Sequence, residues 1–412
     1  MDRDDTRTYE IELTALTYGG DAIGRLPDGR ALFVPYGLPV EKVRTRLVKE
    51  KRGYVRGELV EIMIPSPDRI KPRCSHFGVC GGCHYQHMAY PNQLAAKTVL
   101  LQEQLVRIGG IQNPPVRPGV PSPSEWNYRN HIQFHLDPVG KLGFLGADSH
   151  TVVPIKECHL PENLLNSIWP ELDFELVPGL ERIDLRAGSD EEVMLVLEGS
   201  DPQPPEMSLD LPLSVVYTGP GDPLVLAGEE SLTIEVAGRP FRVSAGSFFQ
   251  VNTSQAGAMV RYVLDSLALS TESTVLDVYC GAGLFSAFLA ERAGKLVGIE
   301  VSPEACEDFA FNLDQNENVE LYQGTAETIL PLLDLKPDFV ICDPPRAGIE
   351  RQTLHAILAM RPSQIVYLSC DPSTLARDLR YLIQGGYQLE DVTPFDLFPQ
   401  TYHIESISRL KA

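Results

Sequence analysis

From about residue 270 onward, apolar β-branched runs alternate with stretches that have helical spacing. The apolar runs include TVLDVYC (274–280), KLVGIEV (295–301), PDFVICDPP (337–345) and QIVYLSC (364–370). Continuous apolar strands separated by helices are typical of a parallel sheet that is covered on both faces. We therefore predict a doubly wound α/β domain over residues 246–412, whose ligands should bind at the carboxyl edge of the strands.

The rest of the chain has a different pattern of apolar residues, glycines and prolines. Residues 8–64 consist of short strand-like pieces with glycine-containing turns, which predicts a small OB-like β-barrel domain over residues 1–66. A proline-rich stretch then marks a boundary. Residues 67–245 contain a cysteine cluster, a helix at about 92–110 that we expect to pack on the C-terminal domain, and strand-like pieces interrupted by Pro and Gly. We predict a central, β-rich domain there.

Composition and charge narrow the class of protein. Hydrophobic residues make up 43% of the 412 residues and charged residues 22%, as in ordinary soluble proteins, and neither a long apolar run nor a signal-peptide pattern is present. We therefore expect a cytoplasmic protein with no membrane association. The net charge of −21 argues against a nucleic-acid partner when taken alone. However, residues 161–240 carry 17 acidic residues and only three basic ones, whereas residues 42–56 carry seven basic residues and one acid. The N-terminal region therefore has a cationic stretch, which could also be a solvated hairpin.

A glycine loop joins the first strand of the α/β domain to its first helix. In LDVYCGAGLFS, Gly281 and Gly283 allow a tight turn and a close approach of the backbone to a ligand. The third glycine of a dinucleotide-binding loop is absent. Glu300 ends the second strand, where doubly wound folds bind a ribose diol, although a solvated acid is the alternative. The pattern favours a nucleoside without a phosphate, such as S-adenosylmethionine.

Two further polar groups end strands at the same edge. Asp343 begins the Asp-Pro-Pro-Arg loop after the fourth strand, a loop that also occurs in methyltransferases acting on amino groups. Cys370 follows the fifth strand, where it could also be a small buried hydrophobe. A thiolate that adds to C6 of uracil makes C5 nucleophilic enough to accept a methyl group. Glu405, in the last strand, is a candidate base for the C5 proton, or else a surface acid on an edge strand.

Five motifs together resemble the RNA uracil-5 methyltransferase family over nearly the whole chain. They are AGSFFQVNTSQA, LDVYCGAGLFS, CDPPRAG, YLSCDPSTLARDL and HIESISRL. The resemblance implies a Rossmann-like class I methyltransferase domain, with Cys370 as nucleophile and Glu405 as base. It implies contacts to S-adenosylmethionine from Gln250, Tyr279, Glu300 and Asp343, beside Gly281 and Gly283. It also implies that Phe248 stacks on the flipped base and that Arg346 contacts the substrate.

The central region contains a four-cysteine pattern. Cys74, Cys80 and Cys83 have the spacing C-x5-C-x2-C, and Cys158 lies far along the chain. Disulfides are rare in cytosolic proteins, so a metal site is expected, with zinc and an iron–sulfur cluster both open and mixed ligation by nearby histidines allowed. The family resemblance favours a [4Fe-4S] cluster, which its ribosomal-RNA branch carries. Methyl transfer from a sulfonium needs no redox step, so a structural role is expected.

These observations lead to one hypothesis for function. We expect an S-adenosylmethionine-dependent enzyme that methylates C5 of a uridine in 23S ribosomal RNA through a covalent adduct between Cys370 and C6. The N-terminal barrel resembles a TRAM domain, which implies RNA binding, and no obligate protein partner is evident. The alternatives are a transfer-RNA 5-methyluridine methyltransferase, an enzyme acting on an amino group, and a non-catalytic iron–sulfur protein that binds RNA or senses redox state.

Overall fold

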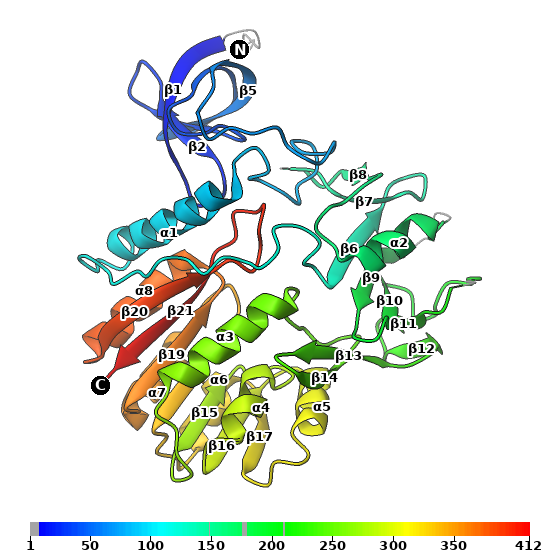
Figure 1. The fold of residues 1–412 in the computed structure, drawn as a ribbon, viewed down its shortest axis with the longest axis vertical. Helices are drawn as coiled ribbons and strands as arrows, with labels where there is room; N and C mark the ends of the chain where they lie inside the picture. Colours follow the sequence, from blue (N-terminus) through cyan, green and yellow to red (C-terminus); the bar gives the residue numbers. More distant parts are fainter. Residues whose placement is uncertain (1–7, 148, 175–178, 209–210) are drawn as a thin grey trace.

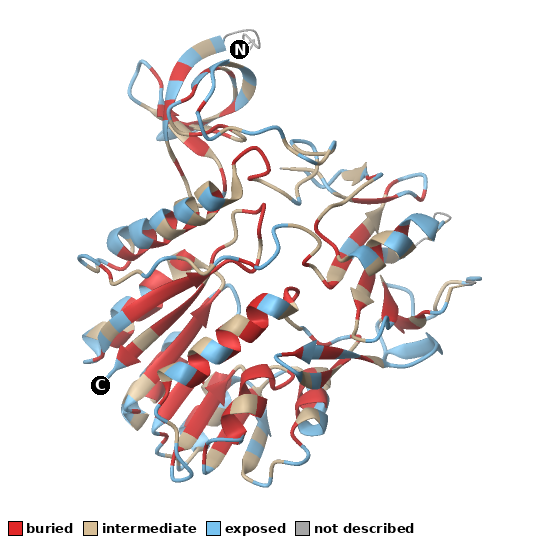
Figure 2. Ribbon diagram, in the orientation of Figure 1, coloured by how far each residue is buried: buried red, intermediate tan, exposed pale blue. Residues whose placement is uncertain are grey.

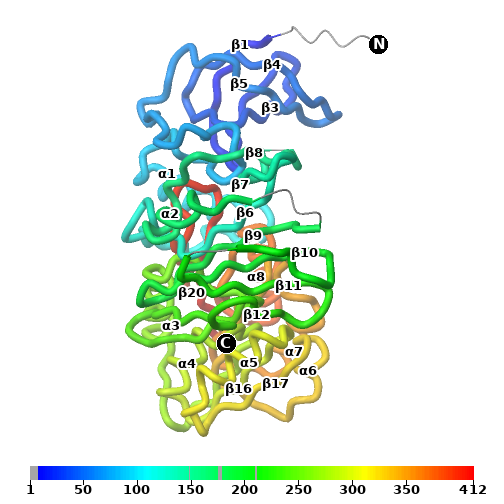
Figure 3. The backbone as a smooth tube through the Cα atoms, turned by 90° about the vertical axis from the view of Figure 1, so that its right-hand side faces the viewer, coloured from blue at the N-terminus to red at the C-terminus, as the bar shows by residue number. Residues whose placement is uncertain are grey.

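Three parts follow one another along the long axis of the protein (Figure 1 and Figure 3). The computed structural model describes residues 8–147, 149–174, 179–208 and 211–412. Residues 1–7, which the predicted barrel domain includes, lie outside this range. The barrel is at one end, the central sheet lies beside and below it, and the C-terminal α/β sheet forms the other end.

The N-terminal part is a closed five-stranded barrel, as predicted, with strand order β1-β2-β3-β5-β4. Its strands are β1 (Thr8–Leu16), β2 (Ala22–Arg25), β3 (Ala31–Val34), β4 (Lys42–Glu50) and β5 (Tyr54–Ile64). Buried and exposed residues alternate along β1 and β4, because successive side chains point to opposite faces of a strand. The inward-facing apolar residues fill the barrel, and the basic residues of β4 face outward.

The helix α1 (Tyr90–Arg107) lies between the barrel and the C-terminal domain. It packs against the helix α8 (Pro372–Gln384) and the strand β20 (Gln388–Phe395). Its buried face carries leucines together with polar residues that are spaced four and seven apart. The helix therefore joins the central region to the C-terminal domain.

The central sheet has the strand order β12-β11-β10-β9-β6-β7-β8. Its elements are β6 (His131–Leu136), β7 (Leu142–Leu145), β8 (Val152–Pro154), α2 (Asn163–Ile168), η1 (Trp169–Glu171), β9 (Leu180–Ala187), β10 (Val193–Gly199), β11 (Ser214–Thr218) and β12 (Leu224–Ala227). Next come the hairpin β13 (Ser231–Val236) and β14 (Arg239–Ser244) and the helix α3 (Thr253–Ser266). This part is rich in strands, as its Pro- and Gly-interrupted sequence indicates.

The C-terminal part is a seven-stranded sheet with the order β17-β16-β15-β18-β19-β21-β20. The elements not yet named are β15 (Thr274–Val278), α4 (Leu284–Ala290), β16 (Lys295–Glu300), α5 (Pro303–Asn312), β17 (Val319–Gln323), α6 (Ala326–Ile329), η2 (Leu330–Leu332), β18 (Phe339–Cys342), α7 (Arg351–Met360), β19 (Gln364–Ser369) and β21 (Glu405–Lys411). The first five strands in this sequence run parallel, and β20 and β21 are antiparallel to their neighbours. Figure 2 shows the inner strands buried under helices on both faces.

The order of the last strands matters for the site. The final strand β21 lies between β19 and β20 rather than at the edge of the sheet. Its backbone is therefore paired on both sides, and the surface edge strand considered as an alternative for Glu405 is wrong. No helix in the described part of the chain is long and apolar enough to cross a membrane.

Candidate functional site

The glycine loop lies at the carboxyl end of β15 and has left-handed backbone at three residues. The φ angles are 68° at Tyr279, 54° at Gly281 and 89° at Gly283. A Cβ atom at Gly283 would lie 2.5 Å from Leu313, so this position requires glycine for packing as well as for conformation. A Cβ atom at Gly281 would instead point into open space. The loop therefore leaves room for a ligand at Gly281.

The carboxylate of Glu300 connects this loop to the end of β16. One oxygen accepts hydrogen bonds from the amides of Val301 (2.7 Å) and Ser302 (2.8 Å), and the other accepts from the amide of Gly281 (2.9 Å). The side chain is thus held at the strand ends, beside the open space at Gly281. Carboxylates in this position bind ribose hydroxyls in doubly wound folds. The carboxylate oxygens of Glu300 are hydrogen-bond acceptors, which suits the hydroxyl groups of a nucleoside ligand.

Cys370 and Glu405 are adjacent across the sheet. Cys370 directly follows β19, and Glu405 is the first residue of β21. Ser369 pairs with Ser406 in this antiparallel ladder, so the next position along each strand brings Cys370 opposite Glu405. The helix α8 begins at Pro372, and the intervening Asp371 caps it by accepting bonds from the amides of Ser373 (2.8 Å) and Thr374 (3.1 Å).

The site is electrostatically unusual because three acidic groups share it. Burial raises the pKa of the Cys370 thiol to about 12, with further contributions from the charges of Glu405 and Asp343. Burial, followed by the charge of Asp343, also raises the pKa of Glu405 well above its usual value. The pKa of Asp343 rises to about 7 by burial. Like charges disfavour one another's ionisation mainly at short range, so the mutual effects of Cys370, Glu405 and Asp343 place these three residues close together.

Arg346 supplies the opposing charge. Its side chain is exposed, and its positive charge lowers the pKa values of Cys370 and Glu405, against the larger effect of burial. Its carbonyl oxygen accepts a hydrogen bond from Thr374 in α8 (3.1 Å), which fixes the loop that carries it. A cation here stabilises a thiolate or carboxylate that forms during a reaction.

The segment before α3 contributes the other predicted contacts. Phe248 is 73% exposed, as a ring that stacks on a ligand needs to be. The carbonyl of Gln250 accepts from the side chain of Asn130 (3.1 Å), and Asn252 donates to the carbonyl of Leu397 (3.3 Å). The segment is therefore tied both to the central sheet and to the chain that precedes Glu405.

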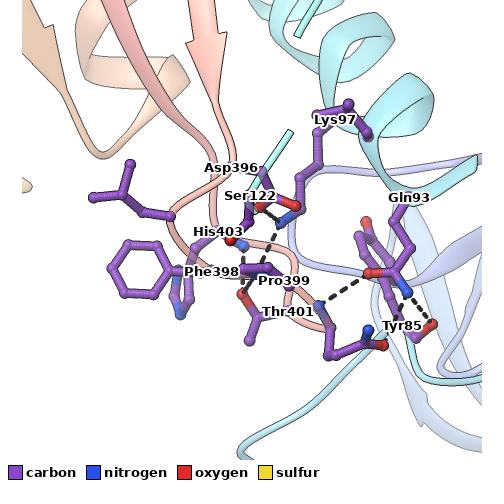
Figure 4. Close-up of polar contacts among 12 residues, drawn as sticks. Tyr85, Gln93, Lys97, Ser122, Asp396, Phe398, Pro399, Thr401 and His403 are labelled. Carbon is purple, nitrogen blue, oxygen red and sulfur yellow. Dashed lines mark hydrogen bonds and ion pairs between the residues drawn. The ribbon is translucent and has the colours of Figure 1, made fainter. Parts of the chain in front are cut away.

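A buried polar cluster holds the segment before Glu405 against α1 (Figure 4). Lys97 bonds to the Asp396 carboxylate at 2.7 Å and to the Phe398 carbonyl at 2.9 Å, and the Lys97 and Asp396 side chains are 3% and 0% exposed. Gln93 exchanges hydrogen bonds with Gln400, from its own amide group to the Gln400 side chain and from the Gln400 backbone amide to the Gln93 side chain (both 2.9 Å). The cluster fixes the turn from β20 to β21.

Replacing Lys97 with methionine is expected to lower the free energy of unfolding by about 3–5 kcal/mol, because Asp396 remains as a buried, uncompensated charge. The double variant Lys97→Met/Asp396→Leu should recover most of this loss. Lys295→Met, which breaks an exposed pair with Glu320, should cost less than about 1 kcal/mol. Denaturant unfolding followed by circular dichroism measures all three. Equal losses for Lys97→Met and Lys295→Met would contradict the expectation.

The four predicted cysteine ligands line one cavity. Cys74, Cys80, Cys83 and Cys158 surround a space of about 170 Å³ between the loop before α1 and the loop after β8. The amides of His76 and Gly82 donate to the sulfur atoms of Cys74 and Cys80, both at 3.4 Å. Burial raises the pKa of Cys83 to about 12 and that of Cys158 to about 11. Cys158, which lies 75 residues beyond Cys83 in the sequence, thus joins the other three cysteines in one sulfur-rich site.

This arrangement differs from a single-ion site. Within the described residues, no group of three or more His, Cys, Asp or Glu side chains is positioned to hold one metal ion. Tetrahedral zinc needs four donors about 2.0–2.3 Å from one point. The four sulfur atoms surround a cavity instead, and their donor chemistry suits a group of several atoms.

Some residues at the site were not predicted from the sequence. Asp277 is buried beneath the glycine loop and accepts from Ser286 (2.5 Å), and burial raises its pKa to about 7. Lys97 had a partial signal, since its four-residue spacing from Gln93 puts polar groups on a buried helix face. Tyr18, from the barrel, donates to Asp371 (2.9 Å), and no local pattern indicates this contact.

Comparisons with known proteins agree with this geometry. The family model for tRNA (uracil-5-)-methyltransferase matches residues 225–412, and the model for the TRAM domain matches residues 5–60. A solved structure of the Pyrococcus abyssi tRNA (uracil-54, C5)-methyltransferase, in complex with S-adenosyl-L-homocysteine, is 25% identical with a TM-score of 0.73. The alignment covers 98% of this chain and all of that one.

Full-length relatives extend the match to the whole chain. An uncharacterized RNA methyltransferase of Gloeobacter violaceus is 35% identical, over 98% of this chain and 96% of the relative. One from Halalkalibacterium halodurans has the same identity and coverage, and one from Aquifex aeolicus is 34% identical over 98% of this chain and 99% of its own length. The chain therefore belongs to the RNA (uracil-5-)-methyltransferase family, with an N-terminal TRAM domain.

Proposed function

We propose that this enzyme transfers a methyl group to C5 of a uridine in 23S ribosomal RNA through a covalent adduct with Cys370. The observation that carries the proposal is the pairing of Ser369 with Ser406, which brings a cysteine and a glutamate face to face at the ligand edge of the sheet. Methylation of an amino group, considered from the Asp343 loop alone, has no need of this cysteine. The family match supports the uracil reaction.

The chemistry follows from the two side chains. The Cys370 thiol loses its proton to solvent, the thiolate adds to C6 of the uracil, and the electron pair of the C5–C6 double bond moves toward O4, making C5 nucleophilic. S-adenosylmethionine, when bound, supplies the methyl group from its sulfonium to C5. Glu405 takes the proton from C5, the double bond re-forms, and the bond from Cys370 to C6 breaks. Glu405 must be ionised to accept this proton, and the positive charge of Arg346 lowers its pKa and so favours the ionised form.

The cofactor site is proposed at the glycine loop. Glu300 would hold the ribose hydroxyls, and Gly281 and Gly283 would let the ligand approach the backbone. Tyr279, Gln250 and Asp343 are the further contacts that we propose, since all three lie on segments that border this edge. The open space at Gly281 supports this position.

RNA is proposed to approach from the barrel side. A groove of about 1,220 Å³ lies between the barrel, the cysteine loop and the central sheet, and Tyr402 also lines it. Its wall includes Arg56, which is paired with Asp21 (3.4 Å), together with Glu58 and the side chains of His84, His135 and His150. An enzyme that modifies a ring carbon must extrude the base, and we propose that the exposed Phe248 stacks on it while Arg346 contacts the substrate. Residues 1–66 would act as the RNA-binding unit.

A transfer RNA is the second candidate substrate. The solved enzyme of Pyrococcus abyssi, which matches this chain from end to end, is named a tRNA (uracil-54, C5)-methyltransferase. The shared TRAM domain and catalytic fold suit either RNA, because structured RNA is recognised largely by its shape and its exposed loops.

Mass mapping of 5-methyluridine at nucleotide resolution, in RNA from a strain lacking the gene, tests the substrate. Loss of one methylated uridine from 23S rRNA supports the first proposal, and loss from transfer RNA supports the second. Purified enzyme with labelled S-adenosylmethionine and bulk RNA from that strain provides the complementary assay. No incorporation into any RNA would contradict both and favour a non-catalytic RNA-binding or redox-sensing protein.

For the four-cysteine cavity we propose a [4Fe-4S] cluster. Four thiols lining one space of about 170 Å³ support this proposal, because a cluster of several atoms needs more room than a single ion. When bound, the cluster would link the loop of residues 74–83 to Cys158, which stabilises the surface beside the groove. The methyl transfer itself needs no electron from it.

Protein purified without oxygen is expected to contain about four iron atoms and about four acid-labile sulfides per chain. Cys158→Ser should lose both, because a ligand is missing, whereas Cys306→Ser, which removes a buried thiol of α5, should keep them. Metal and sulfide analysis measures this. One equivalent of zinc without sulfide would overturn the cluster in favour of zinc.

A further inference from the structure

A turn of the N-terminal barrel reaches the residue that follows the proposed nucleophile. Tyr18 lies in the turn between β1 and β2, and its hydroxyl donates to Oδ2 of Asp371 at 2.9 Å. The turn is closed by bonds to the Asp21 carbonyl from the amide (2.8 Å) and the hydroxyl (2.9 Å) of Thr17. The tyrosine is therefore presented by a well-ordered turn rather than by a free loop.

Asp371 is held on both of its carboxylate oxygens. Oδ1 accepts from the first amides of α8, and Oδ2 accepts from Tyr18. The residues on either side of Cys370 are also bonded to each other. The Ser369 hydroxyl donates to the Asp371 carbonyl (3.0 Å) and accepts from the Asp371 amide (3.2 Å). Cys370 lies between these two fixed residues. Its position thus depends on the bonds that Asp371 makes.

The ring of Tyr18 also contacts the segment that leads to the proposed base. It packs edge-on against Tyr402, with ring centroids 5.9 Å apart, and Tyr402 lies 4.5 Å from His403 and 4.6 Å from His84. Tyr402 and His403 precede Glu405 by three and two residues. One barrel side chain therefore touches both chain segments that carry the proposed reacting groups.

We propose that Tyr18 is a positioning residue for the methyl transfer, acting through Asp371 on the nucleophile, so that the TRAM barrel completes the active site as well as binding RNA. This inference rests on the proposed function of Cys370. Attack on C6 requires the sulfur within a few tenths of an ångström of its productive position. The hydroxyl of Tyr18 holds Asp371 from outside the catalytic domain. Gly19–Asp21, which follow Tyr18 in the same turn, line the groove, so RNA bound there would contact the turn that carries Tyr18.

The test measures adduct formation by the full chain with a transcript that contains 5-fluorouridine. Tyr18→Phe keeps the ring against Tyr402 and removes only the hydroxyl. At saturating RNA the rate constant for adduct formation should fall about tenfold, the effect expected for one hydrogen bond to a charged group. The dissociation constant for the RNA should stay within about twofold, since the groove is unchanged.

The matched control is Tyr387→Phe. Its hydroxyl donates to the Pro362 carbonyl at 2.6 Å in a buried position, just before β20 and at the opposite end of the hairpin from Glu405. This variant loses one buried tyrosine hydrogen bond of similar kind, and its adduct rate should equal that of the wild type. A fall in both variants would indicate a general loss of stability and would overturn the inference.

A second variant tests the same bond in case Tyr18→Phe does not fold. Asp371→Asn keeps a side chain that caps α8 equally well and replaces the charged acceptor of Tyr18. It should slow adduct formation, and the double variant should be no slower than the slower single variant, because both changes break the same link. Additive effects, or a Tyr18→Phe variant with weaker RNA binding and an unchanged rate, would overturn the positioning role. Absence of any adduct with the wild type would overturn the proposed function itself.

Discussion

Cys370→Ala is expected to abolish the covalent complex with 5-fluorouridine RNA and to lower methyl transfer by about 10⁴-fold or more, as for other lost nucleophiles. Without the sulfur, nothing adds to C6, and C5 stays too electron-poor to accept a methyl group. Fluorine at C5 makes the wild-type complex permanent, because after methyl transfer C5 carries fluorine in place of the proton that the base would remove, and fluorine cannot leave as F⁺. The complex is measured on denaturing gels as protein that carries labelled RNA.

Two controls separate chemistry from packing in this experiment. Cys370→Ser nearly keeps the volume of the side chain but has a far less acidic hydroxyl, so it should be as inactive as the alanine variant. Cys342→Ala removes a fully buried thiol of β18 and should still form the complex. A covalent complex that survives Cys370→Ala would show that another residue is the nucleophile.

Glu405→Gln has the second largest expected effect, a loss of about 10²–10⁴-fold in turnover. Cys370 and the methyl transfer are untouched in this variant, but the C5 proton is not removed. The methylated RNA should therefore remain attached to the protein, even when the RNA contains ordinary uridine. Label from the methyl group that migrates with the protein under denaturing conditions is the readout.

Glu390→Gln is the matched control for this variant. Glu390 is an exposed acid on β20, far along the hairpin from the end where Phe395 pairs with Glu405. It should turn over like the wild type and leave no label on the protein. If Glu405→Gln turned over normally, the base would have to be another group, and Asp343 would be a candidate because its charge acts on Glu405.

The α/β domain could be predicted from the sequence because its strands are buried on both faces. Such strands are almost wholly apolar, as in β18 and β19, so they stand out from helices that have a polar face. The site residues then follow by topology, since parallel strands bring their carboxyl ends to one edge. Glu300, Asp343 and Cys370 were predicted in this way. Glu405 was predicted from the chemistry that the cysteine requires, and the sequence pattern alone left a surface acid on an edge strand open as the alternative.

The contacts between distant segments could not be predicted. Lys97 and Asp396 are 299 residues apart, and Tyr18 and Asp371 are 353 residues apart. No local pattern identifies the partner in either pair, because a charged residue in a helix or turn is usually exposed to solvent. The cavity around the four cysteines is similar in this respect. Their spacing indicates metal ligands, but only the fold brings Cys158 to the other three.

The sequence by itself determined which chemical groups stand at the strand ends, since a thiol, a carboxylate and a glycine loop are local features that can be read from the linear pattern. The tertiary structure decided how these groups are held and what environment they share. It inserts β21 between β19 and β20, buries Lys97 beside the turn before Glu405, and brings the barrel against Asp371. The physical reason is that burial and charge depend on all the groups packed around an atom, and most of those come from elsewhere in the chain.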